Sequence, residues 1–417
     1  MISKLATFLI SSSLLVSCSL FIKLDQPNEE IVFKKDLNNR ICSVKNNELT
    51  LTSSSSGDHD LFQERIEIAA KKHKLKPIDV FVIWSLIQMH IRPEKVSPGS
   101  AIQFVDTNDK SPVYENYALK SNNDSNLFFN SLKDLLRRYK SRRSLNYLAR
   151  IVDDILPYQT SVDKELALFL LNNKASLINN KSLKKFFFKG DQVLRPGEGL
   201  KTFKLWPLIS QASYKKNKKN SHLFSFNIGN GKIANCNFDM RIYQNAVYLI
   251  NKDKGHNAHP YSITYKGETF FGISNQSPNT SKNYEGTYSF FPENLGIQNA
   301  VCFIKTPETS LSLISTKGRD SGQHLFNMIE YNIAGAKTPQ EVLTVLDFPR
   351  YLFLLNPERM IYESDRSTEK QTQTFLNTSF PIYHKSNLGS VWIHYKRGST
   401  KSLLIDDRVP NYKSCNK

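Results

Sequence analysis

Acidic residues are scarce in this sequence of 417 residues, which has 38 Asp and Glu against 56 Lys and Arg. The formal net charge of +18 favours an anionic partner or surface, such as nucleic acid, a phosphorylated envelope polymer or anionic lipid. After the first residues no apolar run is long enough to cross a membrane, so we expect the remainder of the chain to be soluble. Apolar residues make up 40% of the sequence, which excludes disorder throughout and suits roughly two or three domains.

Cysteine is also sparse, with five residues in the whole sequence. No two of them lie close together, which argues against a zinc cluster, and we expect neither a metal nor another cofactor. Apart from Cys18, which is treated below, an even number remains: Cys42, Cys236, Cys302 and Cys415. In an exported protein this predicts two disulfide bonds. Three pairings are possible, and the sequence does not select one.

The first residues have the pattern of an export signal. Lys4 supplies a positive charge, and Leu5 to Val16 is an apolar run too short to span a bilayer but typical of a signal-peptide core. It ends at Cys18 in a pattern that resembles the bacterial lipobox, whose cysteine is acylated and becomes the new N-terminus. The alternative is an ordinary signal peptide with a chance cysteine. The lipobox implies anchoring through lipid on Cys18, and Ser19 after it implies sorting to the outer membrane of a bacterial cell envelope.

Periodicity predicts the arrangement of the first half of the chain. Residues 1–17 are expected to be the signal peptide, and residues 18–57 a lipidated tether that ends in a flexible, serine-rich run. From 58 to 200 apolar residues recur at helical spacing. The most apolar helix should begin at Pro77 and end before Pro93, so we expect it to be buried at the centre of a helical domain.

From 201 to 417 the apolar period changes from helical to alternating. Asn230-Gly231 and Lys266-Gly267 separate alternating runs, which predicts a β-hairpin at each pair. Further strands are expected near 300–304, 311–315, 390–395 and 402–405, and helices over 321–334 and 338–346. The predicted fold class is α+β in two domains: an N-terminal all-α domain, then an α+β domain with a mainly antiparallel sheet.

Residues 66–102 carry the resemblance that bears most on function. A helix ends in a basic turn before Pro77, an apolar helix follows, and Val96-Ser97 and small residues come after Pro93. This order resembles the N-terminal motif of the soluble lytic transglycosylase family, which cleaves peptidoglycan and has a lysozyme-like fold. The resemblance implies that the helical domain is lysozyme-like.

The departures from that family concern its chemistry. Counting back from Pro93, the family's catalytic Glu falls on Gln88, and a later Gln of the family falls on Asp106. Glycan cleavage needs a carboxylic acid that donates and then accepts a proton, which an amide cannot do. The resemblance therefore implies a non-catalytic domain that still holds glycan through groups such as Gln88 and His90. The predicted function is to bind or organise peptidoglycan or another anionic envelope polymer.

Two alternatives stay open. An active hydrolase would use a displaced acid, either Glu94 or Asp106, or an uncharacterised site at His324 beside Asp320. For the latter cluster we favour a helix start capped by Asp320. The other alternative is a binding or assembly module for anionic polymers without a glycan groove.

A basic run lies between positions 133 and 150 and contains Arg137, Arg138, Arg142 and Arg143. It is either solvated surface or an anion-binding face. Nucleic acid is a disfavoured partner, because no binding module is recognisable and the predicted compartment argues against it.

His256 and His259 lie close enough in the sequence to be considered as a pair of metal ligands. No thiolate or carboxylate stands beside them at ligand spacing, so we expect a turn there instead of a metal site.

Overall fold

The computed structural model describes residues 40–43, 48–54, 59–107, 112–117, 126–214, 216, 219–241, 256–275, 299–318, 320–354, 359–367, 381–385 and 387–408. Cys18, on which the predicted lipid anchor rests, lies outside these residues, as does Cys415. The anchor and the envelope location therefore stay predictions. Within the described ranges no helix has the length and apolar character needed to span a bilayer.

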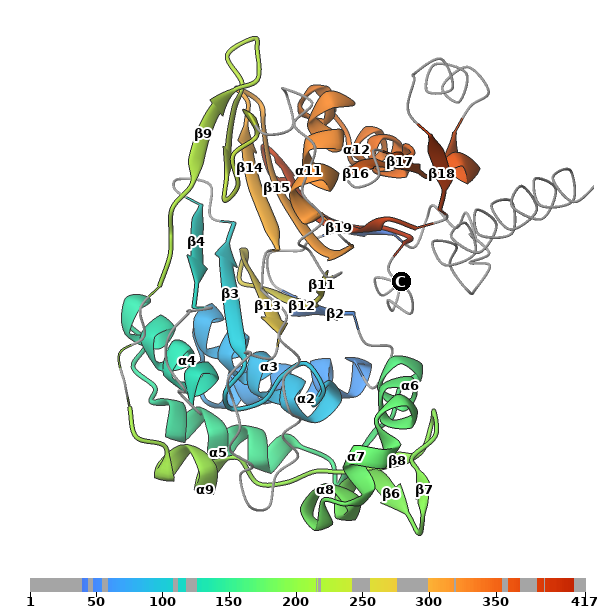
Figure 1. Ribbon diagram of the computed structural model, residues 1–417. Helices are drawn as coiled ribbons and strands as arrows, with labels where there is room; N and C mark the ends of the chain where they lie inside the picture. The colour runs from blue at the N-terminus through green and yellow to red at the C-terminus, as the bar shows by residue number, and fades with distance from the viewer. Residues whose placement is uncertain are drawn as a thin grey trace, which may run out of the picture.

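The larger of two main sheets, sheet A, has eight strands, and every strand pair in it is antiparallel. Its strands are β1 (Ile41–Ser43), β20 (Thr400–Ile405), β19 (Gly389–Arg397), β15 (Thr309–Gly318), β14 (Ala300–Lys305), β10 (Ile233–Cys236) and β9 (Phe224–Asn227) in spatial order, with β11 (His256–Asn257) against β15. The sheet thus joins the beginning of the described chain to its end (Figure 1).

The smaller main sheet, sheet B, has five antiparallel strands. In spatial order they are β2 (Thr50–Ser53), β12 (His259–Tyr265), β13 (Glu268–Asn275), β3 (Ala101–Asp106) and β4 (Val113–Asn116). Strands from the two halves of the sequence pair with one another in this sheet, β2 with β12 and β3 with β13. The two halves therefore share one hydrogen-bonded structure.

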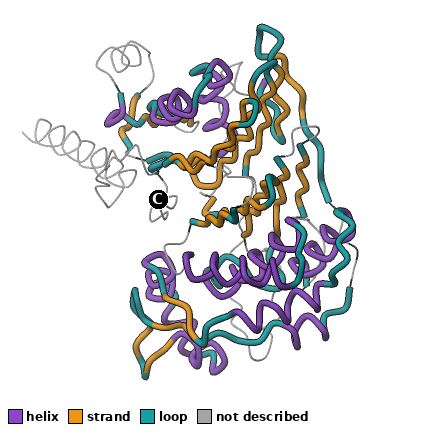
Figure 2. Tube along the Cα trace, turned by 180° about the vertical axis from the view of Figure 1, so that it is seen from behind, coloured by secondary structure: helices purple, strands orange, loops and turns teal. Residues whose placement is uncertain are grey.

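Helices cover the outer face of each sheet, so the molecule has four layers (Figure 2). Those beside sheet B are α2 (His59–Lys72), α3 (Pro77–Ile91), α4 (Leu127–Arg138), α5 (Leu145–Ile155) and α9 (Trp206–Gln211). Those beside sheet A are α11 (Ser321–Glu330) and α12 (Pro339–Asp347), with the short 3-10 helix Ile333–Gly335 between them. A separate apolar cluster that includes Val105, Phe271 and Trp392 lies between the sheets. The fold is stabilised by burial of apolar residues in three places: between sheet B and its helices, between sheet A and its helices, and between the two sheets.

Smaller elements extend the two outer layers. Beside the sheet B helices lie α6 (Lys164–Asn172), α7 (Lys174–Ile178), α8 (Lys181–Phe187) and the strands β5 (Gln159–Ser161), β6 (Phe188–Lys189), β7 (Gln192–Val193) and β8 (Gly199–Lys201). Near α12 lie β16 (Tyr351–Leu354), β17 (Arg359–Tyr362), the 3-10 helix Ser364–Arg366 and β18 (Ile382–His384). The first group has a small apolar core of its own, which includes Leu166 and Leu170.

A fully buried ion cluster ties α12 and β16 to the end of β20. Arg350 donates to Asp406 at 2.5 Å, and Arg408 donates to Glu363 at 2.5 Å and to Asp406 at 3.2 Å. Burial opposes the charged form of Asp406, but Arg350 and Arg408 outweigh it and hold the pKa of that carboxyl below its usual value. Because the charges are paired inside the protein, losing one partner should cost several times more than losing a surface pair.

The α+β class with antiparallel sheets is confirmed, and both predicted hairpins are present as β9–β10 and β12–β13. The prediction of an N-terminal all-α, lysozyme-like domain is wrong. Strands β2, β3 and β4 lie within or before the helical region and belong to sheet B. Strand β3 is buried along its whole length, so its sequence lacks the alternation that marks a half-exposed strand.

Three of the four cysteines predicted to form disulfides, Cys42, Cys236 and Cys302, lie within the described residues. Cys236 and Cys302 face each other on β10 and β14 and are bonded. Cys42 is disulfide-bonded as well. The first bond confirms that one of the predicted disulfides is present, supplies a pairing that the sequence left open, and fastens neighbouring strands of sheet A.

Candidate active site

The chain crosses from sheet A to sheet B within a few residues. Asn257 pairs with β15 in sheet A, the Ala258 amide donates to the Thr316 carbonyl at 3.3 Å, and His259 begins β12 in sheet B. The β2–β12 pairing then brings residue 54 alongside, because the Ser54 amide donates to the Pro260 carbonyl at 3.1 Å. The junction of the two sheets thus places distant segments of sequence next to one another.

Three buried side chains at this junction form a hydrogen-bonded relay. The Ser54 hydroxyl lies 2.8 Å from Nδ1 of His259, and Nε2 of His259 lies 2.8 Å from Oε1 of Gln88 on α3. The exposed fraction is 2% for Ser54, 1% for His259 and 0% for Gln88. Ser54 is separated from His259 by 205 positions and Gln88 from His259 by 171, so only the fold brings them together.

For a neutral imidazole, the relay has one consistent arrangement of protons. The Gln88 amide nitrogen donates to the Trp84 carbonyl at 3.2 Å, which leaves its oxygen facing His259. His259 therefore carries its proton on Nε2 and presents an unprotonated Nδ1 to the Ser54 hydroxyl. A hydroxyl that donates to a neutral imidazole, oriented by a third group, is the arrangement that activates a serine nucleophile.

A second serine–histidine pair lies beside the relay. Ser53 Oγ is 2.9 Å from Nε2 of His59, the first residue of α2. The His59 ring contacts Trp84 edge-on, with ring centroids 5.6 Å apart. His59 lacks the contact to Gln88 that fixes the proton of His259, so the Ser54 relay is the better candidate for catalysis.

The predicted cluster at His324 is the start of a helix. Asp320 accepts from the Gln323 amide at 3.0 Å and caps α11, as the favoured interpretation requires. His324 is fully buried, and its ring nitrogens form no hydrogen bond with Asp320 or Ser321. Burial, assisted by Arg350 and Arg408, holds the pKa of His324 well below its usual value. This histidine is therefore a neutral core residue.

The two predicted substitute acids do not face the relay. Glu94 pairs with Arg92 at 2.5 Å, in a buried cluster in which Arg92 also contacts Asp163 and Glu165. Burial raises the pKa of Glu94, although Arg92 opposes the shift. Asp106, at the end of β3, accepts from the Tyr139 hydroxyl at 2.6 Å. Neither carboxyl takes the place of an acid at Gln88.

His90, predicted to hold glycan beside Gln88, is also a core residue. Its ring lies 4.4 Å from that of Phe203, centroid to centroid, and its carbonyl accepts from the Thr160 hydroxyl at 3.0 Å. Burial lowers the pKa of His90 to about 3, so the ring is neutral at physiological pH.

Most of the predicted anion-binding arginines hold the helical layer together. Arg137 lies over the Tyr214 ring at 4.0 Å, and Arg138 forms an ion pair with the buried Glu115. Arg143 donates to the His73 carbonyl at 2.8 Å and lies over the Tyr147 ring. Arg142 is exposed. Parts of the run therefore stabilise α4 and the turn before α5, and anion binding by these arginines stays a prediction.

A metal centre finds no support among the described residues, which hold no group of three or more His, Cys, Asp or Glu side chains placed to bind an ion. Residues 256–259 read His-Asn-Ala-His and include no Ser, Thr or Cys. The hydroxyl in hydrogen-bond contact with His259 is that of Ser54, which directly follows β2.

Comparison with known proteins bears on the fold. No family model and no curated protein matches the sequence. Cephalosporin acylase from Bacillus halodurans has a similar structure, with a TM-score of 0.61 at 9% identity, over 93% of this chain and 98% of that one. The structure of LmbA2991HD is similar with a TM-score of 0.60 at 7% identity, over 90% and 99% of the two chains. At such low identity the likeness concerns the fold alone, which this chain shares with the acylase.

These likenesses correct the interpretation drawn from residues 66–102. The similarity to the acylase extends over nearly the whole chain, so those residues are part of an acylase-like α+β fold and not of a lytic transglycosylase domain. The predicted function, non-catalytic binding or organisation of peptidoglycan or another envelope polymer, is overturned with it, as is the preference for a non-catalytic protein over an active enzyme. The matching Pro77 and Pro93 are general helix boundaries that unrelated folds share.

Proposed function

We propose that this protein is a hydrolase of acyl bonds, in which Ser54 is the nucleophile and His259 its general base. The relay Ser54–His259–Gln88 carries the proposal, because it supplies a hydroxyl, a neutral imidazole and a group that fixes the imidazole proton. The fold gives support of a different kind, since one of the similar structures is an acylase. We expect the substrate to be an amide or an activated ester.

The chemistry would proceed in two balanced steps. Ser54 Oγ attacks the carbonyl carbon while its proton passes to Nδ1 of His259, and the same proton then leaves with the departing amine. The resulting ester on Ser54 is hydrolysed when water attacks it and gives its proton to His259, which returns that proton to the serine. During both transfers the Nε2–H of His259 stays bonded to Gln88. An amide holds this ring in place but adds no charge, unlike a carboxylate.

The relay is closed to solvent, so the proposal requires that substrate gain access to Ser54. Access and nucleophilicity can be tested together with a fluorophosphonate probe, which loses fluoride and forms a stable adduct with an activated serine. We expect the adduct on Ser54, detected by peptide mass spectrometry, and its loss in Ser54→Ala. The matched control is Ser53→Ala, which removes the hydroxyl one residue away and should leave labelling intact.

Turnover of acyl para-nitroanilides and para-nitrophenyl esters should follow the same pattern. Positioned general-base catalysis is typically worth about 10²–10⁴-fold, so Ser54→Ala and His259→Ala should both fall to near the uncatalysed rate. If Ser53→Ala abolishes labelling and turnover while Ser54→Ala keeps them, the assignment of the nucleophile is wrong. Full activity in both variants would reject the site.

A further inference from the structure

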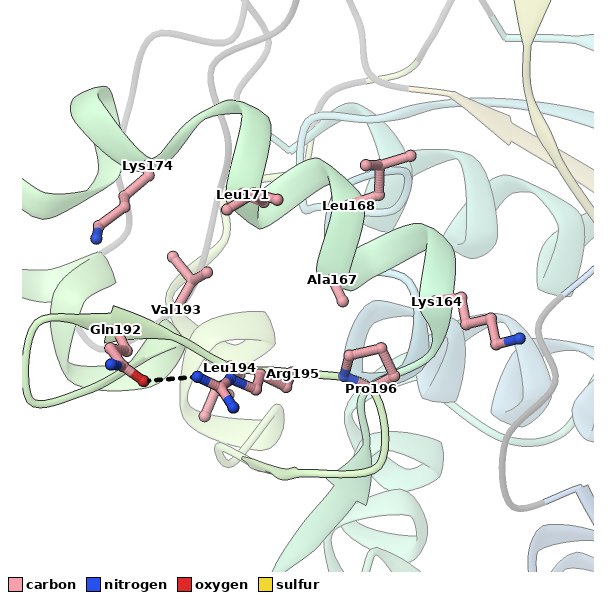
Figure 3. A pocket seen from close by; sticks show the side chains of 10 residues that line it. All are labelled: Lys164, Ala167, Leu168, Leu171, Lys174, Gln192, Val193, Leu194, Arg195 and Pro196. Atoms are coloured by element: carbon pink, nitrogen blue, oxygen red, sulfur yellow. Dashed lines mark hydrogen bonds between the residues drawn. The ribbon is translucent and has the colours of Figure 1, made fainter. Parts of the chain in front are cut away.

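A cavity of about 530 Å³ lies between α6 and the segment from Gln192 to Pro196, far in sequence from the relay (Figure 3). Its apolar lining consists of Ala167, Leu168, Leu171, Val193, Leu194 and Pro196. That volume is within the range of about 300–1,000 Å³ typical of small-molecule sites. The cavity thus has the size and lining of a binding site for an apolar group.

Helix α6 exposes apolar residues in addition to those that it buries in the local core. Leu166 and Leu170 are fully buried in the local core, whereas Leu168 and Leu171 are 56% and 58% exposed. Packing accounts for the first pair only. Exposed leucines that line one concave surface are a recurrent sign of a site for an apolar ligand.

The charged lining residues of this cavity all carry the same sign. They are Lys164, Lys174 and Arg195, and the lining contains no carboxylate. Arg195 donates to the side chain of Gln192 at 3.0 Å, and none of the three cations forms an ion pair within the described part of the chain. An apolar floor with a cationic rim complements a ligand that has an apolar body and an anionic end.

We propose that this cavity binds a single-chain amphiphile with an anionic head group, such as a long-chain carboxylate. The alkyl chain would lie along Leu168, Leu171 and Val193, and the head group would lie near Lys164, Lys174 or Arg195. A docked helix fits less well. A helix is about 10 Å wide and rises about 5.4 Å per turn, so the cavity would hold little more than one turn. This site is independent of the proposed catalysis at Ser54.

The test is calorimetric titration of the full chain with dodecanoate below its micellar concentration. Leu171→Asp places a like charge against the ligand and should weaken binding at least about tenfold. Ile68→Asp is the matched control, because Ile68 is 59% exposed on α2 and does not line the cavity. The double variant Lys164→Gln/Lys174→Gln should weaken dodecanoate and spare dodecyltrimethylammonium, which has the same chain and a cationic head.

Three outcomes would overturn the proposal. Equal losses in Leu171→Asp and Ile68→Asp would show nonspecific association with exposed apolar residues. Equal affinity for the anionic and cationic dodecyl compounds would show that the lysines select nothing. Binding to phosphatidylglycerol vesicles without binding of monomeric dodecanoate would assign the exposed leucines to a membrane surface instead of a cavity. Neither Leu171→Asp nor Lys164→Gln/Lys174→Gln changes a residue of the relay, so acyl hydrolysis should be unchanged in these variants.

Discussion

Replacing Gln88 tests how the relay is oriented. In the natural protein its amide oxygen accepts the Nε2–H of His259 at 2.8 Å, and its amide nitrogen is held by the Trp84 carbonyl. Gln88→Leu keeps the approximate volume and removes the acceptor. The buried Nε2–H would then be unsatisfied, and the imidazole could move its proton to Nδ1. In that tautomer His259 would donate to Ser54 instead of accepting its proton.

The expected loss follows from the burial of the group. An unsatisfied buried donor costs about 1–3 kcal/mol, and about 1.4 kcal/mol corresponds to a tenfold change in rate or population. Because His259 is 1% exposed, water does not replace the lost acceptor at the surface. We therefore expect kcat/KM of Gln88→Leu to fall roughly 10- to 100-fold, and the free energy of unfolding to fall by about 1–3 kcal/mol.

Gln88→Glu should make His259 easier to protonate. A carboxylate beside Nε2 stabilises the imidazolium form, and such a neighbour typically shifts a pKa by about 1–3 units. The pKa of His259 should therefore rise. Since only the unprotonated imidazole accepts the serine proton, the acid limb of the kcat/KM profile should move to higher pH by the same amount.

The assay is the pH profile of acyl-nitroanilide turnover for the natural protein and both variants, alongside urea unfolding. Gln103→Leu is the control, because Gln103 is 1% exposed on β3 and its side-chain nitrogen and oxygen have no hydrogen-bond partner in the described structure. Its activity should be unchanged. An unaltered rate and an unaltered profile in both Gln88 variants would refute the role of Gln88 in setting the His259 proton.

Further predictions concern stability. Arg350→Met leaves Asp406 without one of its two buried arginine partners and should lower the free energy of unfolding by about 3–5 kcal/mol in urea, whereas exposed Arg142→Met should change it by less than about 0.5 kcal/mol. Replacing Cys236 and Cys302 together by Ala should cost about 2–5 kcal/mol, and an equal midpoint in both forms would contradict this. His90 has a pKa of about 3 when folded against 6.5 ordinarily, so the unfolded state binds more protons below pH 6.5 and stability falls as pH falls. His90→Phe should reduce that slope by about 1.36 kcal/mol per pH unit between those limits.

Local signals in the sequence were sufficient for much of the fold. The pair Lys266-Gly267 predicts a tight hairpin, and both residues have the positive φ that such a turn requires, 50° and 77°. Pro77 and Pro93 similarly mark the ends of α3. These features depend on a few neighbouring residues, which is why sequence reasoning found them.

The elements that sequence reasoning missed depend on distant contacts. Strand β3 is buried by α3 and α4 on one face and by sheet A on the other, so its residues carry no alternation to detect. Ser54 stands in a serine-rich run that is typical of a flexible linker, and His259 in a segment that resembles a turn. Neither position has a local pattern that distinguishes it. The sole sequence signal was Gln88, a polar residue in an otherwise apolar helix, which was singled out for the wrong chemistry.

The position of the relay follows from the way the two sheets are connected. The chain leaves sheet A at Asn257, the end of β11, and enters sheet B at His259, the start of β12, so His259 lies at the boundary between the two sheets. Ser54 is held to the same strand by its own amide, and Gln88 is held by α3, which packs on sheet B. Gln88 and His259 therefore lie on a helix and a strand, and Ser54 directly follows β2. Such an array suits proton transfer from Ser54 to His259, because the two groups are already within hydrogen-bond distance.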